Sequence, residues 1–238
     1  MKMRKVLSAL LVAACTLSMA ACGSSSSKET TAAGESAASS ANTAKVIDVD
    51  LTSEEYAFGV DKTQPELLEQ TNTFIQKIKD DGTLDAICAK YFGDGEPEAV
   101  ESAELDSSKD QLVVATNAAF EPFEYTKGDQ YYGIDMEIAK LLADELGKEL
   151  VIQNMSFDAV CLSVGQHKCD LAIAGLTIKE DRKEYVAFSD PYYSASQKLI
   201  TLSTDTEFDA CKTADDVNKI LEAKGSDLKI GFQNGTTG

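Results

Sequence analysis

The residues best suited to hold a small charged molecule lie in one stretch of the chain, 170–193. An apolar run, Leu171–Ala174, indicates a buried strand, and Gly175 ends it with a residue that allows close approach to the backbone. Thr177 adds a hydroxyl, and Arg182 follows in a short charged turn. Because its planar guanidinium can hold two carboxylate oxygens at once, an arginine here points to a carboxylate site. A solvated turn is the other interpretation of these residues, and on spacing alone it is the commoner one.

The elements that would position these residues alternate between strands and helices. Strands are expected at Leu112–Ala115, Leu150–Gln153 and Leu171–Ala174, and helices over Phe157–Val164 and from Ile134, with Ile138, Leu141 and Leu142 facing inward. This alternation is typical of an α/β fold with a mostly parallel sheet. Ligands of such sheets bind beyond the carboxyl ends of the strands. Asn117, Gly175 and Thr177 directly follow strands, so we expect them on that rim.

Composition argues against several classes of function. The 238 residues carry a formal charge of −18, which disfavours nucleic acid as a partner. A single histidine and the lack of a Cys-x-x-Cys motif argue against a zinc site, and no cofactor or metal is expected. Cys88, Cys161, Cys169 and Cys211 allow three full disulfide pairings, and proximity in sequence does not choose among them.

The first 22 residues are typical of an export signal. A positively charged start leads into an apolar run that is too short to span a membrane. Small residues before Cys22 resemble a bacterial lipoprotein processing site, and lipidation of Cys22 would tether the mature protein to the membrane. Simple cleavage after Ala21 is the alternative. Residues 23–45 are low in complexity and lack large apolar groups, so we expect a disordered stalk.

The run DLAIAGLTI, then KEDR, then VAFSDPYY resembles the polar amino-acid-binding proteins of bacterial ABC importers, in solute-binding protein family 3. The resemblance implies an α/β, two-lobed periplasmic-binding-protein type II-like fold, with lobe one complete at 112–203 and lobe two only begun at 204–238. It also implies a monomeric, extracytoplasmic protein, lipid-anchored to the cell membrane. Such a protein is not an enzyme: it binds a small amino acid and delivers it to the permease subunits of an ABC transporter.

The resemblance also assigns ligand groups around the backbone of the bound amino acid. Arg182 would hold the ligand's carboxylate, together with amides near Thr236 and Thr237, where the family begins a helix. The Gly175 carbonyl and the Thr177 hydroxyl would hold its ammonium, helped by an acid from the part of lobe two that is not present here.

Two residues of the first ligand loop would meet the ligand's side chain. Phe120 would cover it, with core packing as the alternative, and Asn117 would touch it. Because Asn117 stands where an acid would favour a cationic ligand, we expect a neutral or acidic polar amino acid.

Residues 46–92 resemble the last segment of the family, although they come first here. A strand at Tyr56–Val60 precedes two helices, the first beginning at Pro65. The apolar face of the first helix comprises Leu67, Leu68, Thr71, Phe74, Ile75 and Ile78. We therefore expect a circular permutation or a duplicated tail, with 46–92 packing on lobe one and 93–111 acting as a linker.

The end of the sequence is expected to enter lobe two. Gln197–Leu202 resembles the first hinge strand, and Thr213 is expected to cap a helix. Leu228–Gln233 is expected to be a strand. Because the family continues with further strands and helices after this point, we expect the chain to be truncated at its C-terminus.

Two other functions use the same fold. An exported dehydratase acting on prephenate-like acids would need a general acid in the cleft. A ligand-sensing module would need an attached transmembrane segment. Turnover assays and the presence of such a segment would separate these alternatives from a transport protein.

Overall fold

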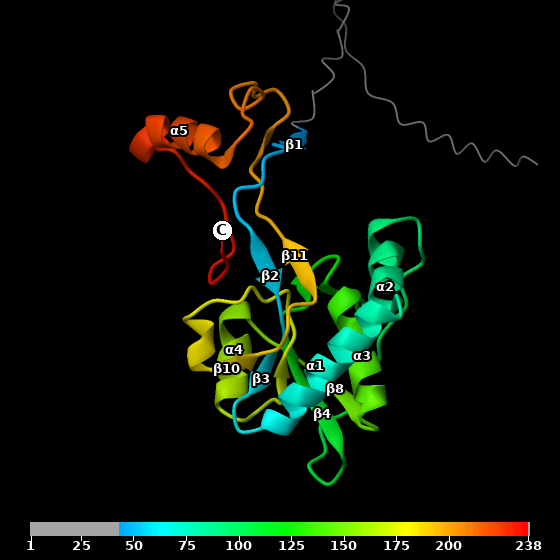
Figure 1. The fold of residues 1–238 in the computed structure, drawn as a ribbon. Coiled ribbons are helices and arrows are strands. Elements are labelled where there is room, and N and C mark those ends of the chain that lie inside the picture. The colour runs from blue at the N-terminus through cyan, green and yellow to red at the C-terminus, as the bar shows by residue number, and fades with distance from the viewer. Residues whose placement is uncertain (1–42, 238) are drawn as a thin grey trace, which may run out of the picture. The chain divides into compact units, whose positions relative to one another are not determined.

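A computed structural model describes residues 43–237, shown as a coloured ribbon in Figure 1. The predicted signal peptide, the lipidation site Cys22 and the stalk as far as residue 42 lie outside the described residues. No helix in the described part is both long and apolar enough to cross a membrane.

The strands that lead into the predicted ligand residues belong to a five-stranded sheet in the order β10-β3-β9-β4-β8. β4 (Gln111–Thr116) pairs in parallel with β8 (Glu149–Asn154) and β9 (Leu171–Ala172). β3 (Gly59–Asp61) is antiparallel to β9 and to β10 (Val186–Phe188). The expected parallel sheet is therefore present in β8, β4 and β9, and the earlier segment adds antiparallel pairings to it.

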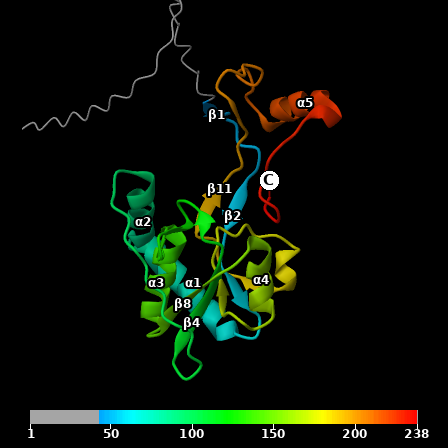
Figure 2. The same ribbon diagram turned by 180° about the vertical axis from the view of Figure 1, so that it is seen from behind.

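Helices cover both faces of this sheet, as Figure 1 and Figure 2 show. α1 (Pro65–Asp80), α2 (Thr83–Phe92) and α3 (Ile134–Glu145) share one apolar cluster with the inner face of the strands. α4 (Phe157–Gly165) packs on the opposite face with a second cluster. The expected apolar face of α1 is correct, because its spacing puts Leu67, Thr71, Phe74, Ile75 and Ile78 on the buried side.

The segment before α1 is an integral part of the sheet. β3 lies between β9 and β10, and Phe58 just before it is fully buried, with its ring 4.7 Å from that of Tyr192. β2 (Glu54–Tyr56) pairs antiparallel with β11 (Tyr193–Ala195). These contacts join the segment before α1 to the sheet, while the division into lobes and the rearranged order of the chain stay predictions.

Two antiparallel connections lead from the sheet to the last described elements. β2 and β11 form the first, and β1 (Ala44–Val46) pairs with β12 (Ile200–Leu202) in the second. α5 (Ala214–Lys224) follows with a small apolar cluster that includes Val217. Thr213 caps this helix as expected, because its side chain accepts from the Asp216 amide and the Asp216 side chain accepts from the Thr213 amide.

A small sheet and two short helical turns complete the described elements. β5 (Ala119–Phe120), β6 (Glu124–Lys127) and β7 (Gln130–Tyr132) form a three-stranded antiparallel sheet beside the first ligand loop. Arg182–Glu184 form the expected turn, of 3₁₀ type, and Gly225–Asp227 form another.

Several sequence predictions of local structure were wrong. The expected strand at Tyr56–Val60 is divided between β2 and β3, because its two halves pair with different partners. Leu228–Gln233 is not a strand, and no described strand pairs with it. The expected inward face of α3 fails at Leu141, which is 36% exposed. The expected stalk extends to Lys45, whereas β1 begins at Ala44.

Candidate ligand-binding site

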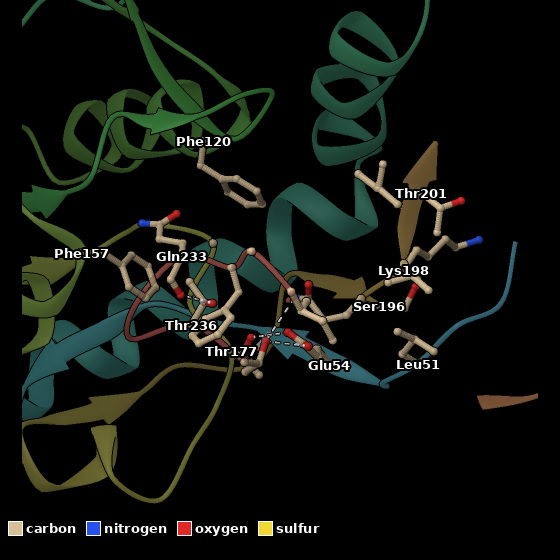
Figure 3. Close-up of a pocket in the computed structure, with 18 of the residues that line it drawn as sticks. Leu51, Glu54, Phe120, Phe157, Thr177, Ser196, Lys198, Thr201, Gln233 and Thr236 are labelled. Carbon is tan, nitrogen blue, oxygen red and sulfur yellow. Dashed lines mark hydrogen bonds between the residues drawn. The ribbon is translucent and has the colours of Figure 1, made fainter. Parts of the chain in front are cut away.

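All seven residues predicted to bind the ligand line one cavity of about 810 Å³ (Figure 3). They are Asn117, Phe120, Gly175, Thr177, Arg182, Thr236 and Thr237. The cavity lies where the carboxyl ends of β4 and β9 meet the β2–β11 connection and the final described loop. Their roles in binding stay predictions, but the proximity that those roles require is present.

Arg182 is the strongest anion-binding group on the cavity. The residue is only 8% exposed, and its Nη1 donates to the Thr177 carbonyl at 2.7 Å. Its Nη2 donates to the Gly235 carbonyl at 3.0 Å, and its guanidinium lies 5.1 Å from the centre of the Phe157 ring. Within residues 43–237, no carboxylate forms an ion pair with this guanidinium. A buried cation without an acidic partner favours an anionic group in the cavity beside it.

Gly175 and Phe120 fit each other closely at the rim. Gly175 has φ +51°, a conformation that favours glycine. A Cβ atom at Gly175 would lie 3.1 Å from the Phe120 ring. The Phe120 ring stacks on Phe123 at 5.5 Å but stays 40% exposed, so it can cover a ligand as well as pack on its neighbour.

Glu54 brings a carboxylate to the cavity from a distant part of the sequence. The residue is 5% exposed and accepts hydrogen bonds from three hydroxyls, those of Thr52 at 2.8 Å, Thr177 at 2.6 Å and Thr237 at 2.7 Å. Figure 3 shows Glu54 and Thr177 on the opposite side of the cavity from Phe120 in this view. Burial works to raise the pKa of Glu54, but the hydrogen bonds from Thr177, Thr237 and Thr52 outweigh it and lower the pKa.

Glu124 is a second acidic residue on the cavity, and its pKa is shifted in the opposite direction to that of Glu54. It lines the cavity although it is 1% exposed, and neither carboxyl oxygen has a hydrogen-bond partner among the described residues. Burial, and then the nearby Asp135 carboxylate, raise the pKa of Glu124 well above its ordinary value. Burial also raises the pKa of Asp135 to about 6, against hydrogen bonds from the Tyr192 hydroxyl and the Gly175 amide.

Asn117 is already engaged by neighbouring residues. Its Nδ2 donates to the Met155 carbonyl at 2.7 Å, and its Oδ1 accepts from Gln233 Nε2 at 3.2 Å. The loop that carries Thr236 is further held by a bond from Asn234 to Asp158 at 3.1 Å. Asn117 therefore joins the final loop to the rim, and its uncharged side chain says little about the charge of a ligand.

The cavity residues that were not predicted from the sequence include Glu54, Glu124 and Phe157. Phe157 opens α4 directly after β8, and its place after a strand was a usable signal. Glu124 lies in the same loop region as Phe120, and an acid beside predicted ligand residues was also a usable signal. Glu54 carried no local signal, since it reaches the site through pairings of β2 with segments far away in the sequence, β11 and the stretch around Thr177. No cluster of metal-ligating side chains occurs within the described part of the chain.

Comparison with known proteins decides the family. Residues 112–231 match the bacterial extracellular solute-binding proteins, family 3. The chain belongs to this family. Its α/β fold is accordingly of the periplasmic-binding-protein type II class that the resemblance implied.

Similar proteins in the family have been named for several activities. The arginine-binding extracellular protein ArtP of Bacillus subtilis is 33% identical over 54% of this chain and 53% of its own length. The arginine-binding periplasmic protein of Mannheimia haemolytica is 33% identical over 53% and 47%. The cyclohexadienyl dehydratase of Pseudomonas aeruginosa is 31% identical over 52% and 47%. The chain thus spans about half the length of these relatives.

A solved structure gives a similar partial match. The arginine-bound, truncated ArgBP of T. maritima is 44% identical over 35% of this chain and 40% of its own, with a TM-score of 0.34.

Proposed function

We propose that this chain binds an α-amino acid in the cavity at Arg182, outside the cytoplasmic membrane, for delivery to an ABC permease. The observation that carries the proposal is the buried guanidinium of Arg182, which has no acidic partner within 43–237. An α-carboxylate would supply the missing charge through two charge-assisted hydrogen bonds. Gly175 and Thr177 lie beside it, and Phe120 and Phe157 provide apolar surface for the rest of the ligand.

The ligand that fits best has a cationic side chain, as arginine does. Glu124 is a carboxyl group on the cavity without a hydrogen-bond partner among the described residues, and a guanidinium would satisfy both of its oxygens. Relatives named for arginine binding support this choice. We therefore revise the preference for a neutral or acidic ligand, because Asn117, which suggested it, is bonded to Met155 and Gln233.

Competition between amino acids tests the ligand class. The full chain would be mixed with equimolar L-arginine, L-lysine, L-glutamine and L-glutamate and weighed by native mass spectrometry. We expect the arginine adduct to dominate, with lysine second. A dominant glutamate adduct would contradict the cationic ligand but keep an amino-acid site, whereas no adduct at all would contradict the proposed function.

Export and anchoring are separate parts of the proposal. They rest on the charged and apolar start of the chain and on the small residues before Cys22. Metabolic labelling with palmitate should mark the wild-type protein and not a Cys22→Ala variant. Equal labelling of the two would contradict lipidation at Cys22.

A dehydratase-like enzyme is the second candidate. One relative is named cyclohexadienyl dehydratase, and burial and the nearby Asp135 carboxylate raise the pKa of Glu124 on the cavity, the direction that a general acid requires. Incubation of the full chain with prephenate discriminates between the two functions. Product formation that disappears in Glu124→Gln would favour the enzyme, and its absence would favour binding alone.

A further inference from the structure

Glu54 is a buried carboxylate whose hydrogen bonds all come from neutral groups. Three threonine hydroxyls donate to it, and no lysine, arginine or histidine pairs with it in the described part of the chain. Two of these hydroxyls, on Thr177 and Thr237, belong to residues that line the cavity. Glu54 therefore presents its negative charge to the cavity without an ion pair to any lysine, arginine or histidine among the described residues.

The bonds to Glu54 also fix where the hydroxyl protons point. A threonine hydroxyl has one proton to donate and two lone pairs with which to accept. Thr177 Oγ1 directs its proton to Glu54 Oε2, and Thr237 Oγ1 directs its proton to Glu54 Oε1. Thr237 Oγ1 also accepts from Gln197 Nε2 at 3.1 Å. Both hydroxyls are consequently left with lone pairs only, so a ligand group beside them has to be a hydrogen-bond donor.

Thr177 connects this acceptor region to the anion-binding side of the cavity. Its carbonyl is held by Arg182 at 2.7 Å, and its hydroxyl is held by Glu54 at 2.6 Å. A carboxylate at Arg182 and a donor at the Thr177 hydroxyl would thus be neighbours. An α-amino acid has this pairing of groups on a single carbon atom.

We propose that Glu54 fixes the hydroxyls of Thr177 and Thr237 as acceptors and thereby selects ligands that carry an α-ammonium group. The inference rests on the proposed function and deepens it. Glu54 is a positioning residue in this scheme: it acts through the two threonines and through its charge, while Arg182 holds the carboxylate. The N-terminal segment that contributes β2 is then part of the ligand site as well as of the sheet.

The test compares two probes that differ only in the α-ammonium group. L-arginine carries it, and δ-guanidinovaleric acid has the same carboxylate, chain and guanidinium without it. Calorimetric titration of the full chain would give the affinity of each probe for the wild type, Glu54→Gln and Thr177→Val. Glu55→Gln is the matched control, because Glu55 is the next residue of β2 and its side chain is exposed.

In Glu54→Gln, we expect the affinity for L-arginine to fall about tenfold or more, because a charge and the hydroxyl polarity are lost together. The affinity for δ-guanidinovaleric acid should change by less than about twofold, because no ammonium is present to lose a partner. Thr177→Val should show the same selective loss. The double variant should lose no more than either single one, because Glu54 acts through Thr177.

Three results separate the possible failures. Equal losses for both probes in a folded Glu54→Gln, or no loss for either, would overturn the role of Glu54 and leave amino-acid binding intact. A wild type that binds neither probe would overturn the proposed ligand and this inference together. If Glu54→Gln does not fold, a Thr177→Val variant that loses both probes equally overturns the inference.

Discussion

Glu54 and Arg182 hydrogen-bond to different groups of Thr177, Glu54 from 123 residues earlier in the chain and Arg182 from the turn that follows. The Arg182 guanidinium donates a hydrogen bond to the Thr177 carbonyl, and the Glu54 carboxylate accepts one from the Thr177 hydroxyl. Neither Arg182 nor Glu54 forms an ion pair with another residue of the described part, so Thr177 separates a buried cation from a buried anion on the wall of one cavity. This order of charges is complementary to a zwitterion.

The N-terminal segment should contribute strongly to stability. Phe58→Ala should lower the free energy of unfolding by about 3–5 kcal/mol, because a fully buried ring that packs on Tyr192 is removed. Chemical denaturation followed by circular dichroism would measure it. Leu105→Ala is the control: this side chain is 59% exposed, and its loss should change the free energy by less than about 0.5 kcal/mol. Similar small losses for both variants would show that the segment before α1 is not integral to the sheet.

Gly175→Ala should reduce ligand affinity by moving the Phe120 ring. The new Cβ would lie 3.1 Å from that ring, and the positive φ should also cost roughly 1–2 kcal/mol of stability. Gly128→Ala is a matched control, because Gly128 has φ +61° with nothing within 4 Å of an added Cβ. Thermal melts should show both variants destabilised, and titration with L-arginine should show weaker binding in Gly175→Ala alone. Unchanged affinity in Gly175→Ala would remove the Phe120 contact from the site.

Site residues that lie close together in the sequence could be predicted, whereas a residue placed by distant strand pairing could not. Gly175, Thr177 and Arg182 could be predicted because they lie on one strand–turn unit whose periodicity and turn residues are visible locally. Glu54 could not, since its place depends on which strand β2 pairs with, and a short polar run does not specify that partner.

The failed strand at Leu228–Gln233 has a related cause. An alternating apolar run becomes a strand only when a neighbour supplies its hydrogen bonds, and no described strand lies beside it. Ile230 and Phe232 are accordingly 50% and 67% exposed. Periodicity predicted α1 well because a helix satisfies its own backbone hydrogen bonds.

The free energy of unfolding of the ligand-free protein should depend on pH through the carboxyl group of Glu124. Its pKa is raised on folding by burial and by Asp135, so the folded state keeps its proton more tightly than the unfolded chain. The stabilisation is complete below the ordinary glutamate pKa and is lost as pH rises through the raised value. Glu124→Gln should lack this loss, so the difference in unfolding free energy between variant and wild type should grow from pH 4 to pH 8. A difference that is constant over this range would contradict the raised pKa.

Arginine binding should depend on pH through the same carboxyl group. A guanidinium at Glu124 favours the ionised carboxylate, so wild-type affinity for L-arginine should increase as pH rises from 5 to 8. In Glu124→Gln the affinity should be weaker and nearly independent of pH. Calorimetric titration at several pH values gives both curves, and parallel curves would place the ligand's side chain away from Glu124.

The four cysteines in the described part of the chain are free thiols, and the Cys161 thiol should react more slowly with an alkylating agent than the Cys211 thiol. Burial raises the pKa of Cys161 to about 11, so very little thiolate is present at neutral pH. Iodoacetamide labelling of the native full chain, read by peptide mass spectrometry, should modify the partly exposed Cys211 well before Cys161. Equal labelling rates, or a peptide mass that shows a disulfide at Cys161, would contradict this arrangement.

The most direct test of the account is the affinity of Arg182→Ala for L-arginine. Lys183→Ala is the matched control, because Lys183 is the next residue of the same turn and its side chain is 47% exposed. Calorimetric titration of the folded full chain should show a loss of about 100-fold or more in Arg182→Ala and no significant change in Lys183→Ala. Binding by Arg182→Ala with wild-type affinity would contradict the claim that this guanidinium holds the ligand's carboxylate.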